Sequence, residues 1–497
     1  MRVSTQTNKH MKRITIAAFI ALGTLQANAQ DYSISEGGTV EMEKQKDSEA
    51  SSFTAGGTHY FITSHYKSPS TMYNMQSVAA DGSGIQSSEL SVPVGEFGNS
   101  FSISSVIGLG NQAYAIVENY NSQDNKRVLS ARKMQADGSI EESGDDIMMI
   151  NFEKMLRPGR LMTATSPDGS HLVAVGVLPF NKKESRKFKV AVFDASLKEI
   201  SSSEITLDGL AIKNARFETV IANDGTVYIN RYTSKMKDGI KILVHQYNSK
   251  SSSIDNTYLV EAAAGDVMGE YLYTTNDAGE LVIAAAFRKD VKVYTGDEEQ
   301  SGVFIFRNEG KSDGVIEYND LDTPAPNFEL TGIHITGETI YVTGEDAKME
   351  KNSPAQTTPT TANSTFTFTH GNEYILGFNP SGKKMFELLI DLSMSARTTK
   401  HSLYSSSHII DGELVYIFND QFSKYRDDDD IASGGTIPVA VNVDATGLMT
   451  PAVPFINDLK MTNGYMLLPN YSAVSGNTVT LLARDGNMLK SVSITAE

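Results

Sequence analysis

Basic and aromatic side chains occur together in four segments of the chain, each directly after a short apolar run. Lysine and arginine attract anions over long distances, and tyrosine rings offer flat apolar area to a sugar ring or a partner's side chain. The four segments together hold ten basic residues and four acidic ones. They predict a ligand-binding basic sector formed by Tyr66, Lys67, Tyr120, Lys126, Arg127, Lys182, Lys183, Arg231, Tyr232 and Lys235.

The expected partner of this basic sector is an acidic envelope or extracellular protein, or an anionic glycan. Later segments reverse the sign of the charge, with Asp297, Glu298 and Glu299 in one and Asp427–Asp430 in another. Exposed charges contribute little to stability, so we expect charge reversals in the sector to change binding and leave the fold intact. The alternative is that these loops are exposed and simply polar.

Two short motifs suggest catalysis or metal binding, and both have simpler explanations. Gly310–Gly314 matches G-x-S-x-G, which works only where a strand turns into a helix, and no helical run follows it in this chain. Asp427–Asp430 could bind Ca²⁺, but four adjacent acids point in different directions, and a solvated loop fits better. No glycine-rich phosphate motif and no HExxH occurs. The sequence therefore predicts no catalytic residue, no cofactor and no metal site.

A second hypothesis is a carbohydrate-active hydrolase or lyase with loop carboxylates such as Asp297, Glu298 or Asp420. Glycoside hydrolysis needs two carboxylates at a fixed separation inside a cleft, which spacing along a chain does not show. Two buried, converging carboxylates would favour the enzyme, and a shallow face would favour binding. The histidines, including His59 and His408, match no metal-ligand spacing and are expected to be structural.

A unit that recurs eight times must position these segments: a glycine turn followed by a short strand of alternating apolar residues. The glycines are 53 to 75 residues apart, at Gly57, Gly110, Gly169, Gly225, Gly279, Gly337, Gly412 and Gly476. A strand-rich unit of this length is typical of a β-propeller, whose blades pack around an axis as a single domain. We expect an all-β propeller of eight four-stranded blades, with seven as the alternative, over residues 30–497.

The ring is expected to close by pairing of the two ends of the chain. The eighth repeat is one strand short, and the segment 32–42 is one strand in excess. Pairing them would hide the sheet edges that an open array exposes. In the alternative, the N-terminal segment is a flexible tail and the ring has seven blades.

Turns and insertions complete the predicted blades. The third and fourth strands are expected to join in two-residue hairpins, because Asp-Gly and Ser-Gly adopt positive φ readily, as at Asp81-Gly82, Asp137-Gly138 and Ser381-Gly382. Loop insertions are expected at 344–373 and 419–435, the first a mobile loop up to about residue 364 followed by a resumed strand. Inner strands rich in Ser and Thr suit the crowded axis of a propeller; a solvated, hydroxyl-lined channel is the functional alternative.

The first residues match an export signal. Lys12 and Arg13 precede an apolar run, and Ala27-Asn28-Ala29 supplies a cleavage site, so residues 1–29 are expected to be removed. The apolar run is shorter than the roughly 20 residues that span a membrane. The mature chain would carry 39 basic and 60 acidic residues, which argues against nucleic acid as a partner. The chain has no cysteine, hence no disulfide. We expect a periplasmic or secreted protein that does not span a membrane.

One turn resembles a known family. Ser166-Pro167-Asp168-Gly169, followed by a short apolar strand, is similar to the S-P-D-G turn of TolB-type propellers. Asn223-Asp224-Gly225 and the segment 276–279 are looser echoes of it. The resemblance implies a propeller and an exported context, and no particular activity. The chain has no tryptophan and so lacks the Trp-containing motifs of WD-repeat, sialidase and quinoprotein propellers.

Overall fold

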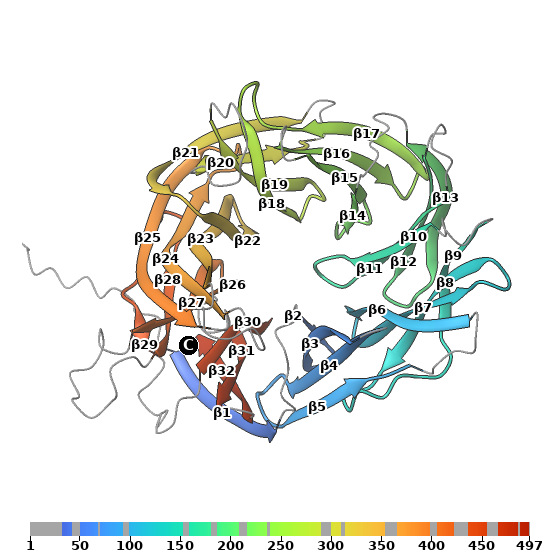
Figure 1. Cartoon of the computed structure of the whole chain (residues 1–497), viewed down its shortest axis with the longest axis horizontal. Coiled ribbons are helices and arrows are strands. Elements are labelled where there is room, and N and C mark those ends of the chain that lie inside the picture. The colour runs from blue at the N-terminus through green and yellow to red at the C-terminus, as the bar shows by residue number, and fades with distance from the viewer. Residues whose placement is uncertain are drawn as a thin grey trace, which may run out of the picture.

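The strands of this protein form eight sheets arranged in a ring around a central axis (Figure 1). The computed structural model describes residues 32–41, 50–67, 70–92, 99–152, 159–179, 186–207, 216–235, 239–289, 300–309, 314–352, 365–397, 405–421, 436–454, 466–485 and 488–496. Within these ranges all regular structure is β, and each sheet has four antiparallel strands. The expected eight-bladed, all-β propeller is confirmed, and the seven-bladed alternative is wrong.

Each blade runs from an inner strand near the axis to an outer strand at the rim (Figure 1). Blade 1 is β2 (Ala50–Ala55), β3 (Thr58–Lys67), β4 (Ser70–Ala79) and β5 (Ile85–Leu90). Blade 2 is β6 (Asn99–Leu109), β7 (Gln112–Asn121), β8 (Lys126–Met134) and β9 (Asp145–Asn151). Blade 3 is β10 (Arg160–Thr165), β11 (His171–Val177), β12 (Arg186–Asp194) and β13 (Glu199–Leu207). Blade 4 is β14 (Arg216–Ile221), β15 (Val227–Lys235), β16 (Gly239–Asn248) and β17 (Ser253–Val260).

The second half of the ring follows the same order. Blade 5 is β18 (Val267–Thr275), β19 (Leu281–Arg288), β20 (Gln300–Arg307) and β21 (Val315–Ala325). Blade 6 is β22 (Phe328–Thr336), β23 (Thr339–Asn352), β24 (Thr365–Phe378) and β25 (Lys384–Arg397). Blade 7 is β26 (Ser406–Ile410), β27 (Glu413–Gln421), β28 (Thr436–Val443) and β29 (Val453–Pro454). Blade 8 is β30 (Met466–Ser475), β31 (Thr478–Asp485), β32 (Met488–Ala496) and, outermost, β1 (Tyr32–Glu41).

The hydrophobic core is divided among the blade interfaces. Eight clusters of buried apolar side chains occur in the described residues, and each joins two neighbouring blades. Both faces of a blade are therefore covered, so the second strands are rich in buried apolar residues; β19 is buried from Leu281 to Arg288. Outer strands such as β13 alternate buried with exposed residues. The apolar runs that follow the repeated glycines in the sequence are thus the second strands of the blades, which pack against neighbouring blades on both faces.

The ring closes through the two ends of the chain, as expected. β1 pairs antiparallel with β32, from Tyr32 opposite Ala496 to Glu41 opposite Met488, with a bulge between Glu36 and Thr39. The interface between blades 8 and 1 carries its own apolar cluster, which includes Phe61. The N-terminal strand therefore completes blade 8 beside the C-terminus (Figure 1).

The turns between third and fourth strands are longer than predicted. β4 and β5 are joined by residues 80–84, where Ser83 donates its backbone N–H to Asp81 Oδ1 at 2.8 Å and Gly82 has φ +75°. The aspartate side chain caps the turn and so favours a wider loop than a two-residue hairpin. Two-residue turns instead join first and second strands, as at Asp411-Gly412, where φ is +49° and +87°.

Blades 3, 4 and 5 share one five-residue turn between their first and second strands. Gly169, Gly225 and Gly279 each have positive φ and donate the backbone N–H to the carbonyl three residues earlier, at 2.9, 3.0 and 2.9 Å. The Ser166–Gly169 turn and its two looser echoes in the sequence therefore have the same backbone arrangement.

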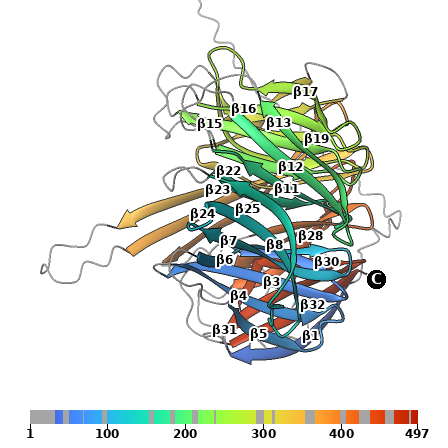
Figure 2. The ribbon, with the colours of Figure 1, turned by 90° about the vertical axis from the view of Figure 1, so that its right-hand side faces the viewer.

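Blade 6 extends beyond the ring. β23 and β24 stay paired from Ile340 opposite Phe378 to Asn352 opposite Thr365, and this hairpin projects from the body of the molecule (Figure 2). The strand expected to resume at Phe366 is confirmed by β24. The expected signal peptide, most of Gly310–Gly314, the loop 353–364 and Asp427–Asp430 lie outside the described residues. No helix in the described part of the chain is long and apolar enough to cross a membrane.

Closure by β1 leads to a stability prediction. Deleting residues 31–42 would expose the edge of β32 and part of the cluster between blades 8 and 1, and exposed edges pair with other molecules. We expect a large fall in melting temperature or aggregation, measured by circular dichroism and size-exclusion chromatography. The control lacks only residues 1–30. A deletion variant that stays monomeric with the control's melting temperature would contradict closure by β1.

Candidate functional site

The structure places the two basic-sector residues of blade 2, Lys126 and Arg127, in ion pairs. Arg127 Nε lies 2.6 Å from Glu118 Oε1, and Arg127 Nη1 donates to the Gly159 carbonyl at 2.6 Å. Lys126 Nζ lies 3.2 Å from Asp124 Oδ2 at the surface. Tyr120 stacks on Phe152 with 5.4 Å between ring centroids. Nearby carboxylates therefore compensate the charges of Lys126 and Arg127.

Arg231 corrects the expectation that the basic sector is exposed. Its side chain is 2% exposed, because β15 lies inside blade 4 and the residue faces blade 3 beside Phe217. Burial, with the nearby Arg186 charge, lowers the pKa of Arg231. Burial and then the Arg231 charge lower the pKa of His245 to about 4. Reversing the charge of Arg231 would therefore disturb packing as well as any surface potential.

The other predicted residues divide into three groups. Tyr66, Lys67 and Lys235 lie at strand ends where the backbone is described and the side chains are not. Lys182 and Lys183 lie outside the described residues. Tyr232 lines a pocket between blades 4 and 5. A joint role of the sector in binding stays a prediction.

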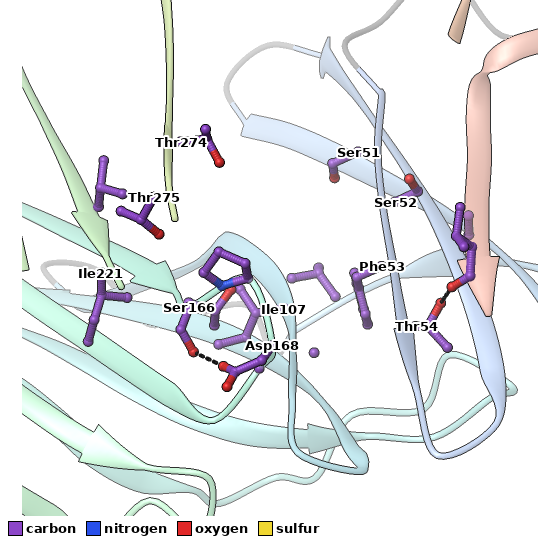
Figure 3. A pocket seen from close by; sticks show the side chains of 18 of the residues that line it. Ser51, Ser52, Phe53, Thr54, Ile107, Ser166, Asp168, Ile221, Thr274 and Thr275 are labelled. Atoms are coloured by element: carbon purple, nitrogen blue, oxygen red, sulfur yellow. Dashed lines mark hydrogen bonds between the residues drawn. The ribbon is translucent and has the colours of Figure 1, made fainter. Parts of the chain in front are cut away.

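The axis of the propeller contains a cavity of about 640 Å³. Its lining comes from the inner strands of most blades and from the Ser166–Gly169 turn (Figure 3). The polar part of the lining consists of Ser51, Ser52, Thr54, Thr165, Ser166, Asp168, Thr274, Thr275, His408 and Ser472. Phe53 and Tyr273 add aromatic surface. Hydroxyl-bearing side chains of inner strands therefore line a cavity on the axis, and a solvated channel stays a prediction.

Several of the axial hydroxyls join neighbouring blades. Ser52 donates to the Ser472 carbonyl at 2.6 Å, which links blade 1 to blade 8. Ser105 and Thr163 are 3.2 Å apart between blades 2 and 3. His408 Nε2 lies 2.8 Å from Ser472 Oγ between blades 7 and 8. Part of the axial hydroxyls therefore have a structural role, because they hydrogen-bond to a neighbouring blade.

Two other lining groups, Thr275 and Asp168, are candidates for contact with a ligand. Thr275 is 9% exposed, and its buried Oγ1 has no hydrogen-bond partner. A buried hydroxyl without a partner is costly, and a ligand or water would satisfy it. Burial alone would raise the pKa of Asp168, but hydrogen bonds from Ser166 and Ser170 outweigh it and lower that pKa below its ordinary value. Asp168 therefore presents an ionised acceptor at the cavity wall.

Two buried carboxylates converge elsewhere, at the interface of blades 6 and 7. Glu345 and Glu373 are directly opposite on β23 and β24, and are 4% and 0% exposed. Tyr416 donates its hydroxyl to Glu373 and lies 2.5 Å from Ser405 Oγ. Burial, with the charges of Glu373 and Glu345, raises the pKa of Tyr416, so its phenol remains a donor. A pair this inaccessible is not arranged for contact with a substrate.

The carboxylates named for the enzyme hypothesis do not form such a pair in the described structure. Asp420 is buried near the end of β27, and Asp297 and Glu298 lie outside the described residues. The described residues contain no group of three His, Cys, Asp or Glu side chains placed to bind a metal ion.

No family model matches the chain, and no curated protein matches it. Among solved structures, the chain is similar to the polysaccharide lyase Uly1, with 9% identity, coverage of 82% of this chain and 92% of that one, and a TM-score of 0.37. The WD40 domain of SCAP from fission yeast is 8% identical, with coverage of 94% and 98% and a TM-score of 0.37. The propeller domain of the Trilobed protease from Pyrococcus furiosus is 11% identical, with coverage of 80% and 94% and a TM-score of 0.36. These similarities assign no ligand and no activity, and the resemblance to TolB-type proteins holds only as a propeller fold.

The axial histidines predict a dependence of stability on pH. Burial lowers the pKa of His334 to about 4, and burial with the His334 charge lowers that of His408 to about 4. An unfolded imidazole titrates near pH 6.5, so the unfolded chain binds more protons between about pH 4 and 6.5. The free energy of unfolding should fall over that window as pH decreases, by about 3 kcal/mol per imidazole, and level off below it.

Denaturant titrations between pH 4 and 7.5 measure this dependence. The double variant His334→Gln, His408→Gln should show a shallower slope than the wild type, because Gln does not titrate. An identical slope in both proteins would contradict the assignment to these two rings.

The buried carboxylates predict the effect of removing one hydroxyl. Tyr416→Phe takes away a donor to Glu373 and should cost about 1.5–3 kcal/mol of unfolding free energy, as for hydrogen bonds to charged groups. The control is Tyr318→Phe, whose exposed hydroxyl donates to the Glu261 carbonyl at 3.3 Å and whose loss should cost less than about 0.5 kcal/mol. Equal stability losses in the two variants would contradict a special role for Tyr416.

Proposed function

We propose that this chain is an exported, non-enzymatic binding propeller that holds a neutral, hydroxyl-rich ligand, such as a saccharide segment, in its axial cavity. The observation that carries the proposal is the cavity of about 640 Å³ with Thr275 Oγ1 buried and unpartnered in its wall. Small-molecule sites in proteins have volumes of about 300–1,000 Å³. The match to an export signal at residues 12–29 supports a periplasmic or secreted location.

The chemistry of the lining favours a neutral polyhydroxylated ligand. Serine and threonine hydroxyls both donate and accept, and the Asp168 carboxylate only accepts, so a ligand hydroxyl finds both kinds of partner. Phe53 and Tyr273 offer aromatic surface for the apolar face of a sugar ring. An anionic ligand would be repelled by Asp168, the one acid among the lining residues.

The geometry supports binding better than hydrolysis. Glycoside hydrolases place two carboxylates on either side of the scissile bond, within reach of substrate. Asp168 has no second carboxylate among the lining residues of the axial cavity, and Glu345 and Glu373 do not line it. The converging pair Glu345 and Glu373 is too deeply buried to meet a substrate, so it does not favour the enzyme hypothesis.

Thr275→Val tests the proposal because it removes the unpartnered hydroxyl and keeps the side-chain shape. Binding is measured on an array of neutral and acidic oligosaccharides and then by calorimetry with the neutral saccharide that binds best. We expect affinity to fall about five- to tenfold, the value of one hydrogen bond, with no loss of stability. The matched control is Thr206→Val, a change at an exposed position of the outer strand β13.

Binding that is confined to acidic saccharides, or that is the same in Thr275→Val as in the wild type, would overturn the axial site. Binding that disappears with rising salt would instead point to the basic sector.

A further inference from the structure

A second cavity, of about 560 Å³, is lined by residues of blades 4, 5 and 6. It is separate from the axial cavity, although Tyr273 borders both. Its lining consists of Tyr232, Tyr271 and Tyr273, Glu218 and Glu270, and the apolar Ile240, Leu272 and Leu330. Three aromatic rings and two carboxylates thus share one pocket, which we call the tyrosine pocket.

The rings form walls that meet at an angle. Tyr232 and Tyr271 are 5.7 Å apart between centroids, with their planes at 74°. Tyr271 and Tyr273 are 6.3 Å apart and inclined by 34°. All three side chains are partly exposed, so ring surface remains open to the pocket. Ring faces that border an open volume attract a cation that lies within about 6 Å of a ring centroid.

The carboxylates make the pocket electronegative. Tyr271 donates its hydroxyl to Glu218 Oε2 at 2.9 Å, which fixes the ring beside the acid. Burial, followed by the charge of Glu218, raises the pKa of Tyr273 to about 12 and raises that of Tyr271 as well. Both phenols therefore stay neutral at physiological pH. Glu270 adds a second acid at an irregularity in β18, between Met268 and Tyr271.

Two described arginines lie near the acid Glu218. Arg231 alternates with Tyr232 along β15 and faces blade 3, away from the pocket. Arg216 is the cation nearest to Glu218 along the strand, because it lies opposite Tyr232 and two residues before Glu218 on the same face of β14. Its side chain is exposed. Arg216 is therefore a charge at the rim that opposes binding of a further cation.

We propose that the tyrosine pocket binds an organic ammonium group. Ring faces attract a cation through their quadrupole, and the acids at Glu218 and Glu270 offer only acceptors, so the pocket combines the two interactions that select a positive guest. This site goes beyond the axial site, because it lies in a different cavity and takes a ligand of opposite chemistry. The ammonium can belong to a free small molecule or to a lysine side chain of a partner protein.

Choline and its uncharged isostere 3,3-dimethyl-1-butanol test the charge dependence. Titration of the full-length wild-type protein by calorimetry or ligand-observed NMR should show choline binding at least tenfold more tightly than the isostere. Glu218→Gln should weaken choline binding about five- to tenfold, and Tyr271→Leu should weaken it at least as much. The second probe is Nα-acetyl-lysine N-methylamide, which keeps a free ε-ammonium group. Tighter binding of this probe than of choline would identify a partner's lysine as the source.

Arg216→Ala provides the variant that folding defects do not explain. The residue is exposed, and its removal takes away the opposing charge, so choline affinity should rise two- to fivefold, with the gain lost at high salt. Thermal melts of every variant establish that it is folded. Equal affinity for choline and its isostere, absence of binding by either ammonium probe, or an unchanged affinity in both Glu218→Gln and Arg216→Ala would overturn the proposal. None of these outcomes depends on whether the axial cavity binds a saccharide.

Discussion

Every blade of this propeller needs a neighbour on both faces, and the rest of the structure depends on that constraint. The apolar clusters lie between blades, so a ring that failed to close would leave two blade faces in water, and a missing outer strand would leave a sheet edge unpaired. β1 supplies that strand, and it comes from the opposite end of the chain to β32. The first blade is joined to the last without a disulfide, by this pairing, the cluster around Phe61 and hydrogen bonds such as that of Ser52 to the Ser472 carbonyl.

Closure of the ring also determines which side chains meet at the propeller axis. The inner strands are brought close together, so small hydroxylated side chains meet across blade boundaries, as Ser105 and Thr163 do. The same small side chains leave an axial cavity, where Thr275 Oγ1 has no partner. Other polar groups are buried at the blade interfaces, as Glu373 and Tyr416 are between blades 6 and 7. Some polar residues near the axis therefore hydrogen-bond between blades, and others, such as Thr275, have no partner in the protein.

The sequence predicted the features that depend on local chemistry. Glycine turns, apolar second strands and the spare strand at residues 32–42 follow from short-range patterns, and all are present. The widths of the Asp-Gly turns were wrong because the aspartate side chain captures backbone N–H groups, a choice that spacing does not show. Arg231 was wrongly expected to be exposed because β15 lies within a blade, and its burial depends on Phe217 and on blade 3.

The sequence could not predict the pockets, because they too depend on how neighbouring blades pack. The tyrosine pocket combines Glu218, Tyr232 and Tyr271 from three strands, and only the packing of blade 4 on blade 5 brings them together. Hydroxyl-rich inner strands did suggest a channel, but they could not separate bonded hydroxyls from available ones. That distinction requires knowing which residue lies opposite each one in the next blade, as Ser472 lies beside His408.

Hydrogen–deuterium exchange of the intact protein tests the central claim most directly, that the axis of a closed ring is a ligand site. The experiment compares the free protein with the protein saturated by the neutral saccharide that binds best. The account predicts slower exchange in β18 and in the turn at 166–170, on the cavity wall, with the projecting hairpin of β23 and β24 unchanged. Slower exchange confined to strand ends on the loop-bearing face, with β18 and the turn unaffected, would contradict it.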